Sequence, residues 1–183
     1  MNGRRHIAVL CFLALITNSG QAQAVFRSFN SSLHVKATWN GLPVLATTDE
    51  ARVIIDYEKA TLDITFDPAA LRTGVPELDS ILVQHHGLPV SIMAKLVGVD
   101  HIQTVKHPPM DFDLEGRLAH MDFDAPIMGK GHLEHIFAGL YACLLDVTFN
   151  VPVERFQLDR TFPGLSGDIT LHIVQSLLKR AND

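Results

Sequence analysis

The chain has 183 residues, with 15 Lys and Arg against 20 Asp and Glu, and its formal net charge is −5. This length suits a single domain with a sizeable core. An acidic balance without a basic run argues against nucleic acid or an anionic lipid surface as a partner.

The first 24 residues have the three parts of a cleaved export signal. Arg4 and Arg5 supply the positive start, residues 7–16 form an uncharged apolar run, and Ala22-Gln23-Ala24 offers small residues to a signal peptidase. The run is far shorter than the ~20 apolar residues of a membrane-spanning helix. We therefore expect a periplasmic or secreted protein that does not span a membrane.

Cleavage after residue 24 would leave one domain of residues 25–183. Cys11 would be lost with the signal, so Cys143 would be the single cysteine of the mature chain. No intramolecular disulfide could then form, and stability would come from the core.

The dominant period after the signal is two, which places alternate side chains on opposite faces of a strand. In 61–66, for example, Leu62, Ile64 and Phe66 alternate with Thr61 and Asp63. The pattern covers 61–66, 90–96, 110–118, 121–127, 141–153 and 169–173, and more weakly 26–37, 52–57 and 132–136. One apolar face and one polar face indicate antiparallel pairing, because parallel sheets are covered on both faces.

Turn signals separate these strands, and one stretch has helical spacing instead. In 76–84, Leu78, Ile81 and Leu82 share one face and Pro76 suits the first turn. The turn signals include Asn40-Gly41, Pro108-Pro109, Gly129-Lys130-Gly131 and Pro163-Gly164. The sequence predicts an all-β antiparallel fold of about eight strands with one short helix, either a closed barrel or a sandwich.

The order of several short motifs resembles the YceI-like family over most of the mature chain. After the strand ending at Phe66, residues 67–74 (DPAALRTG) are similar to the family's D-x-x-S-L-x-T-G turn, with Ala70 in place of Ser. Residues 88–92 resemble its Y-P-x-x-F strand start, 112–118 its V-x-G-x-L hairpin strand, and 167–173 its closing strand. Residues 118–124 lack the Gly and the basic residue that usually follow the hairpin strand in the family.

The resemblance implies a lipocalin-like barrel that encloses an isoprenoid or another amphiphilic lipid and performs no chemistry on it. The inward rows would then line an apolar lumen, with the 76–84 helix as a lid, and a lipid or isoprenoid would be the partner. The expected lumen residues are Leu62, Ile64, Phe66, Ile92, Phe112, Leu114, Phe123, Val147 and Phe149. A long apolar tail gains about 25 cal/mol per Å² of surface that such a lumen removes from water.

Two other functions remain open at this point. Histidines are numerous, and an envelope metal-binding protein would need His85, His86, His132 and His135 to converge. A filled sandwich that acts as a ligand-free stress or interaction module would use the same inward rows as ordinary core. The sequence leaves a homodimer open as well.

The residues that could carry catalysis have simpler explanations. Asp111, Asp113 and Glu115 form the polar row of a strand, and Cys143 belongs to an apolar row where a thiol is a small buried hydrophobe. Ser166 lies in a sequence that falls one residue short of a nucleophile elbow. We expect no catalytic residue, no cofactor and no resident metal, and therefore not an enzyme.

Overall fold

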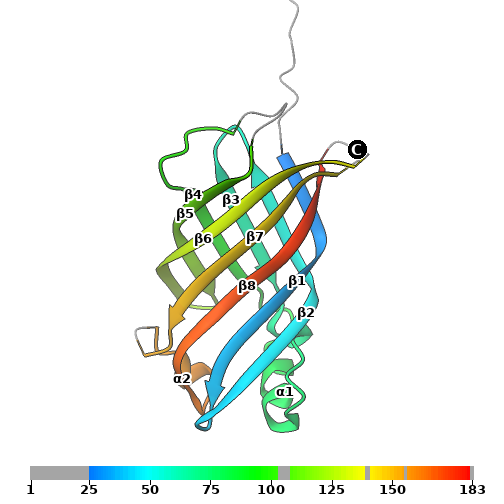
Figure 1. Cartoon of the computed structure of the whole chain (residues 1–183). Coiled ribbons are helices and arrows are strands. Elements are labelled where there is room, and N and C mark those ends of the chain that lie inside the picture. Colours follow the sequence, from blue (N-terminus) through cyan, green and yellow to red (C-terminus); the bar gives the residue numbers. More distant parts are fainter. Residues whose placement is uncertain (1–24, 103–107, 139–140, 155, 182–183) are drawn as a thin grey trace, which may run out of the picture.

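The computed structural model describes residues 25–102, 108–138, 141–154 and 156–181, and the predicted signal at 1–24 lies outside them. These residues form eight strands and three short helical segments (Figure 1). The strands are β1 Val25–Trp39, β2 Leu42–Asp56, β3 Thr61–Phe66, β4 Val90–Leu96, β5 Met110–His120, β6 Phe123–Ala138, β7 Tyr141–Pro152 and β8 Leu165–Arg180. The helical segments are the 3-10 turn η1 Pro68–Ala70, α1 Pro76–Val83 and the four-residue α2 Leu158–Thr161.

The eight strands form one closed antiparallel barrel. Each strand pairs with the next along the chain, and β8 pairs with β1, for example at Val35 and Leu171. This closure decides between the two predicted architectures in favour of the barrel. A barrel of eight strands has an interior that side chains fill or that holds one small ligand.

The helical segments gather at one end of the barrel. Both α1 and α2 lie at the end where the β1–β2 hairpin turns, and the C-terminus lies at the opposite end (Figure 1). The hairpin turn is Asn40-Gly41, as predicted, with φ of 50° and 77°. Two successive positive φ angles fit the tight turns that match strand twist.

The interior beyond this end is a packed apolar core. Tyr57, Leu62, Ile64, Leu114 and Phe149 are at most 1% exposed. No helix in the described part of the chain has the length and apolarity needed to cross a membrane.

The predicted turn at Gly129-Lys130-Gly131 is wrong, because these residues lie inside β6. The two predicted strands at 121–127 and 132–136 are therefore largely one long strand. A Cβ at Gly131 would collide with the ring of Phe112, and one at Gly129 would collide with the ring of Phe149. The glycines make room for neighbouring aromatic rings rather than for a turn.

Candidate functional site

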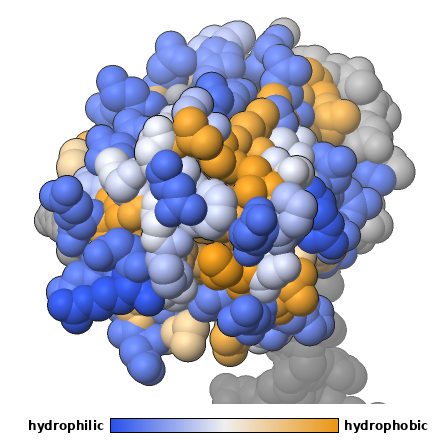
Figure 2. All heavy atoms as spheres, turned by 90° about the horizontal axis from the view of Figure 1, so that it is seen from below, coloured by the Kyte–Doolittle hydropathy of each residue, from blue (hydrophilic) through white to orange (hydrophobic). Residues whose placement is uncertain are grey.

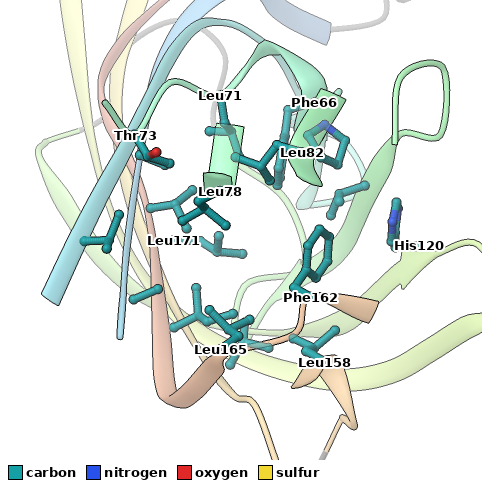
Figure 3. A pocket seen from close by; sticks show the side chains of 18 of the residues that line it. Phe66, Leu71, Thr73, Leu78, Leu82, His120, Leu158, Phe162, Leu165 and Leu171 are labelled. Carbon is teal, nitrogen blue, oxygen red and sulfur yellow. The ribbon is translucent and has the colours of Figure 1, made fainter. Parts of the chain in front are cut away.

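An apolar cavity of about 120 Å³ lies inside the barrel at the helical end (Figure 3). Strand ends form its wall, while Leu78 and Leu82 of α1, Leu158 of α2 and Phe162 border it on the side of the connections. The strands and turns contribute Val35, Ala37, Val44, Ala46, Phe66, Pro68, Leu71, Thr73, Val90, Leu118, His120, Val151, Leu165, Ile169 and Leu171. Seen from this end, the surface shows hydrophobic side chains set among polar ones (Figure 2).

Small side chains on β1 and β2 create the space. Val35 is paired with Ala46, and Ala37 with Val44, so four small residues lie together where larger ones would fill the barrel. Ala46 is 6% exposed and Val35 and Val44 are half-buried. The two Val-x-Ala patterns, in 35–37 and 44–46, are the sequence signal for this hollow.

The lining offers little to a polar ligand. Among the described residues that line the cavity, Thr73 and His120 alone have polar side chains. The Thr73 hydroxyl already donates to the Asp79 carboxylate at 2.7 Å. The cavity therefore suits a hydrocarbon group, which is stabilised by removal from water.

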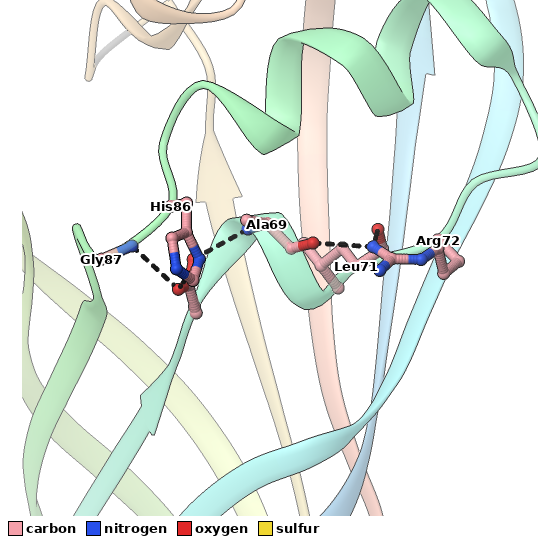
Figure 4. Close-up of polar contacts among 6 residues, drawn as sticks. Ala69, Leu71, Arg72, His86 and Gly87 are labelled. Carbon is pink, nitrogen blue, oxygen red and sulfur yellow. Dashed lines mark hydrogen bonds and ion pairs between the residues drawn. The ribbon is translucent and has the colours of Figure 1, made fainter.

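Asp67 joins the two ends of the segment that carries α1, and Figure 4 draws the hydrogen bonds that Ala69 and Gly87 make to it. Its Oδ1 accepts from the Ala69 N–H at 2.9 Å, and its Oδ2 accepts from the Gly87 N–H at 2.9 Å. The same Oδ2 lies 3.1 Å from His86 Nδ1. One carboxylate thus joins the start of the connection, before α1, to its end, after α1.

Two further contacts stiffen this connection. Arg72 Nη1 donates to the carbonyls of Ala69 and Leu71 at 2.7 and 2.9 Å (Figure 4). Asp79, on α1, accepts from the Thr73 N–H at 2.9 Å in addition to the Thr73 hydroxyl. These residues hold α1 over the barrel end, so its Leu78 and Leu82 reach the cavity.

The electrostatics of Asp67 and Asp79 follow from these contacts. Burial by itself would raise the pKa of each carboxyl group. Hydrogen bonds to Asp67 from the Gly87 and Ala69 N–H groups, with His86 nearby, more than offset this and lower its pKa. The hydroxyl and N–H of Thr73 similarly lower the pKa of Asp79. Both carboxylates are therefore ionised when they hold the connection at neutral pH.

Three rings meet at the edge of the cavity. His120 is buried at the end of β5, and its Nε2 lies 3.3 Å from Nδ1 of His85, in the turn after α1. The Phe162 ring lies 4.6 Å from the His85 ring and 6.2 Å from that of His120, centroid to centroid. Burial, and then the neighbouring His120, lower the pKa of His85.

The structure separates the predicted lumen residues into three groups. Phe66 lines the cavity. Leu62, Ile64, Ile92, Phe112, Leu114, Val147 and Phe149 are buried in the packed core beyond it. Phe123 is half-buried outside the cavity, in a groove at the β5–β6 turn, with its ring edge-on to Phe156 at 5.3 Å. A role of these nine residues in ligand binding stays a prediction.

The sequence interpretation missed the connection between β7 and β8. Leu158 and Phe162 line the cavity, yet the segment around them has no alternation and only one turn of helix. The predicted helix at 76–84 was found as α1 Pro76–Val83, and its buried Leu78 and Leu82 were visible as a helical face. Short irregular segments give no comparable signal.

The other candidate groups lie at separate places in the fold. His132 Nδ1 pairs with Asp111 at 2.7 Å on the outer face, whereas His85 and His86 lie beside α1. Within the described ranges, no group of three or more His, Cys, Asp or Glu side chains is placed to hold a metal ion. Cys143 is fully buried, and burial raises the pKa of its thiol to about 12 although a hydrogen bond from Tyr57 acts in the opposite direction.

Comparison with known proteins supports the fold. No family model matches the chain, and no curated protein matches it. A solved structure, a polyisoprenoid binding domain from Saccharophagus degradans implicated in plant cell wall breakdown, matches with a TM-score of 0.62. The match has 10% sequence identity and covers 87% of this chain and 99% of that one. The two chains share the eight-stranded barrel, and the neighbour is a binding domain.

Proposed function

We propose that the protein is an exported carrier that holds the apolar chain of an isoprenoid or another amphiphilic lipid and performs no chemistry on it. The observation that carries the proposal is the apolar cavity between the small residues of β1 and β2 and the leucines of α1. The description of the structural neighbour as a polyisoprenoid binding domain supports the same class of ligand.

The size of the cavity defines how a long chain would be accommodated. A cavity of ~150 Å³ holds a molecule of about the size of benzene, so 120 Å³ accepts only the first part of a lipid tail. Each further buried CH₂ group contributes about 0.8 kcal/mol. The proposal therefore includes displacement of α1 and Phe162, which border the cavity with side chains and are not held there by strand pairing.

The direct test is native mass spectrometry of the purified protein, followed by organic extraction of what co-purifies. We expect an isoprenoid or acyl compound at about one per chain, because the cavity has room for one chain end. A mass equal to that of the chain alone, with no added lipid taken up from micelles, would contradict a carrier role.

A cavity-filling variant links binding to this cavity. Ala46→Phe places a ring among the small residues, whereas Ala119→Phe adds the same ring on the outer face of β5 as a matched control. Retinol, a neutral fluorescent isoprenoid alcohol, is the probe, and energy transfer from Trp39, the single tryptophan, reports its binding. We expect Ala46→Phe to weaken retinol binding at least ~10-fold, which corresponds to about 1.4 kcal/mol, and Ala119→Phe to leave it unchanged. Equal retinol affinity in a folded Ala46→Phe variant would place the ligand elsewhere.

A further inference from the structure

A thin wall separates the apolar cavity from a groove on the outside of the barrel that is lined by both polar and apolar side chains. The groove lies between the β5–β6 turn and α2, and it shares His120 and Leu158 with the cavity. His85 lines the groove, and Phe162 lines the cavity. The wall is therefore one side chain thick at this point.

The wall is made of side chains that could move without breaking the barrel. His85 and Phe162 lie in the connections after α1 and α2, outside the eight strands. His120 is the last residue of β5, and Figure 3 shows it on the same side of the cavity as Phe162. Rotation of His85 and Phe162 would join the cavity to the groove while every strand pair stays intact.

We propose that His85, His120 and Phe162 form a proton-sensitive gate through which the ligand enters and leaves the cavity. The proposal rests on the carrier function above and adds its route and its regulation. An apolar tail would lie in the cavity, and the polar end of the lipid would lie in the groove.

The contact between the two imidazoles depends on their protons. In the neutral pair, His85 Nδ1–H can donate to His120 Nε2 while His120 Nδ1–H faces the Pro89 carbonyl at 3.4 Å. A first proton can be accommodated by a change of tautomer. When both rings are protonated, both facing nitrogens carry hydrogen at 3.3 Å, and two positively charged rings lie 5.3 Å apart, centroid to centroid. The doubly protonated pair cannot keep the closed geometry.

The surrounding charges leave this repulsion largely uncompensated. The charged and titratable groups that face the pair are Asp122, Asp124 and Arg160 in the groove, and His86 with Asp67 behind the turn after α1. Asp124 is held by Arg117 Nε at 2.8 Å, and Asp67 is held by His86 and backbone N–H groups. Asp122 and Arg160 then have opposite effects on a proton in the groove.

The direction of the pH effect follows from the closed geometry. Burial and the neighbouring ring lower the pKa of His85 when the gate is closed, and an open gate restores contact with water. The open state therefore binds protons more readily, so falling pH favours opening. Each extra proton taken up by the open state shifts the opening equilibrium by up to about tenfold per pH unit.

Amide hydrogen exchange on the ligand-free protein tests the gate itself, at pH 7.5 and pH 5.5 and corrected for intrinsic exchange rates. We expect opening of α1 and of residues 158–162 to increase at pH 5.5 by at least about threefold, while β3 and β4 stay protected. The variant His85→Phe/His120→Phe keeps the rings without titrating, and His85→Asn is a second, smaller change. Both should lose the pH dependence, whereas His132→Asn, on the outer face, should retain it.

Retinol dissociation, followed by Trp39 fluorescence in stopped flow, tests whether the gate serves the ligand. We expect dissociation to accelerate between pH 7.5 and pH 5.5 in the wild type and in His132→Asn, and not in the two gate variants. If amide exchange of α1 and of residues 158–162 changes by less than about twofold between pH 7.5 and pH 5.5, the gate is overturned even if retinol binds. Exchange that responds to pH while retinol dissociation does not would overturn its role as the ligand route. Failure of the carrier function would instead appear as absence of retinol binding at both pH values.

Discussion

At the scale of single residues, the interior is set by which positions lack a large side chain. On β1 and β2 the small residues Ala37 and Ala46 face an empty space, whereas on β6 the missing side chains of Gly129 and Gly131 are replaced by aromatic rings from neighbouring strands. Small residues therefore leave a cavity at one place and allow close packing at another. The difference lies in the partner strands, because β5 and β7 each place a phenylalanine ring against a glycine of β6.

This contrast gives a stability prediction for Gly131. Gly131→Ala would place its Cβ against the Phe112 ring, so we expect the free energy of unfolding to fall by about 1–3 kcal/mol. Phe112→Leu removes the obstructing ring, and the double variant should therefore lose less than the sum of the two single variants. Urea unfolding measures these values, with the exposed neighbour Lys130→Ala as a control within ~0.5 kcal/mol of the wild type. Strict additivity of the two changes would show that ring and glycine do not depend on each other.

At the scale of elements, the connection from β3 to β4, residues 67–89, covers part of the barrel end and is held at both of its ends. Eight helical residues are too few for a stable isolated helix, so α1 depends on its surroundings. Asp67 supplies much of this support by joining Ala69 and Gly87 across the segment. Near the end of this connection, the His85 ring packs against the rings of His120 and Phe162.

Removal of the Asp67 carboxylate should destabilise this connection, by an amount that depends on pH. Asp67→Ala should lower the free energy of unfolding by about 1–2 kcal/mol at pH 7, comparable to the loss of a helix cap. The folded-state pKa of Asp67 lies below its ordinary value, so its contribution is fully present above that value and is lost as pH falls through the folded-state pKa. Urea titrations at pH 7 and near pH 3 should show the gap between wild type and variant narrowing in acid. The matched control is Asp113→Ala, an exposed carboxylate of β5, which should show little effect at either pH.

The elements that the sequence predicts well are those whose pattern is local. Alternation in 61–66 and 90–96 gives β3 and β4 with their observed bounds, and the face shared by Leu78 and Leu82 gives α1 to within one residue. The continuity of β6 through Gly129 and Gly131 was not predicted, because it depends on rings supplied by the two paired strands β5 and β7 and not on the local pattern of β6.

The candidate site was predicted less well, for a related reason. Eight of the nine residues expected to line the lumen are buried, but whether a buried residue meets a cavity or a packed core depends on the opposite wall. Phe66 meets the cavity because α1 and the small residues of β1 and β2 surround it, and Leu62, only four residues earlier, is fully packed. The contribution of Phe162 depends on how an irregular connection folds back over the barrel, which no periodic pattern encodes.

At the scale of the whole molecule, closure of the barrel couples its two ends. The β1–β8 pairing removes the free edges from the sheet, so exposure of the packed core requires strands to separate. The cavity lies at one end, whereas Cys143 lies near the start of β7 and contacts Tyr57 in the packed core. A ligand in the cavity should therefore stabilise the core at the far end, although it touches nothing there.

The thiol of Cys143 makes this coupling measurable. Burial raises its pKa to about 12, and the reactive thiolate is therefore absent near neutral pH until the barrel opens. In a Cys11→Ser variant, which leaves Cys143 as the single thiol, we expect modification by a disulfide reagent to follow the unfolded fraction as urea is added. Saturating retinol should slow the reaction by the factor 1 + [L]/Kd, about 100-fold at 100 times Kd, because the ligand binds the folded barrel alone. Protection that is much smaller than this factor, with retinol demonstrably bound, would mean that the core around Cys143 opens independently of the cavity end.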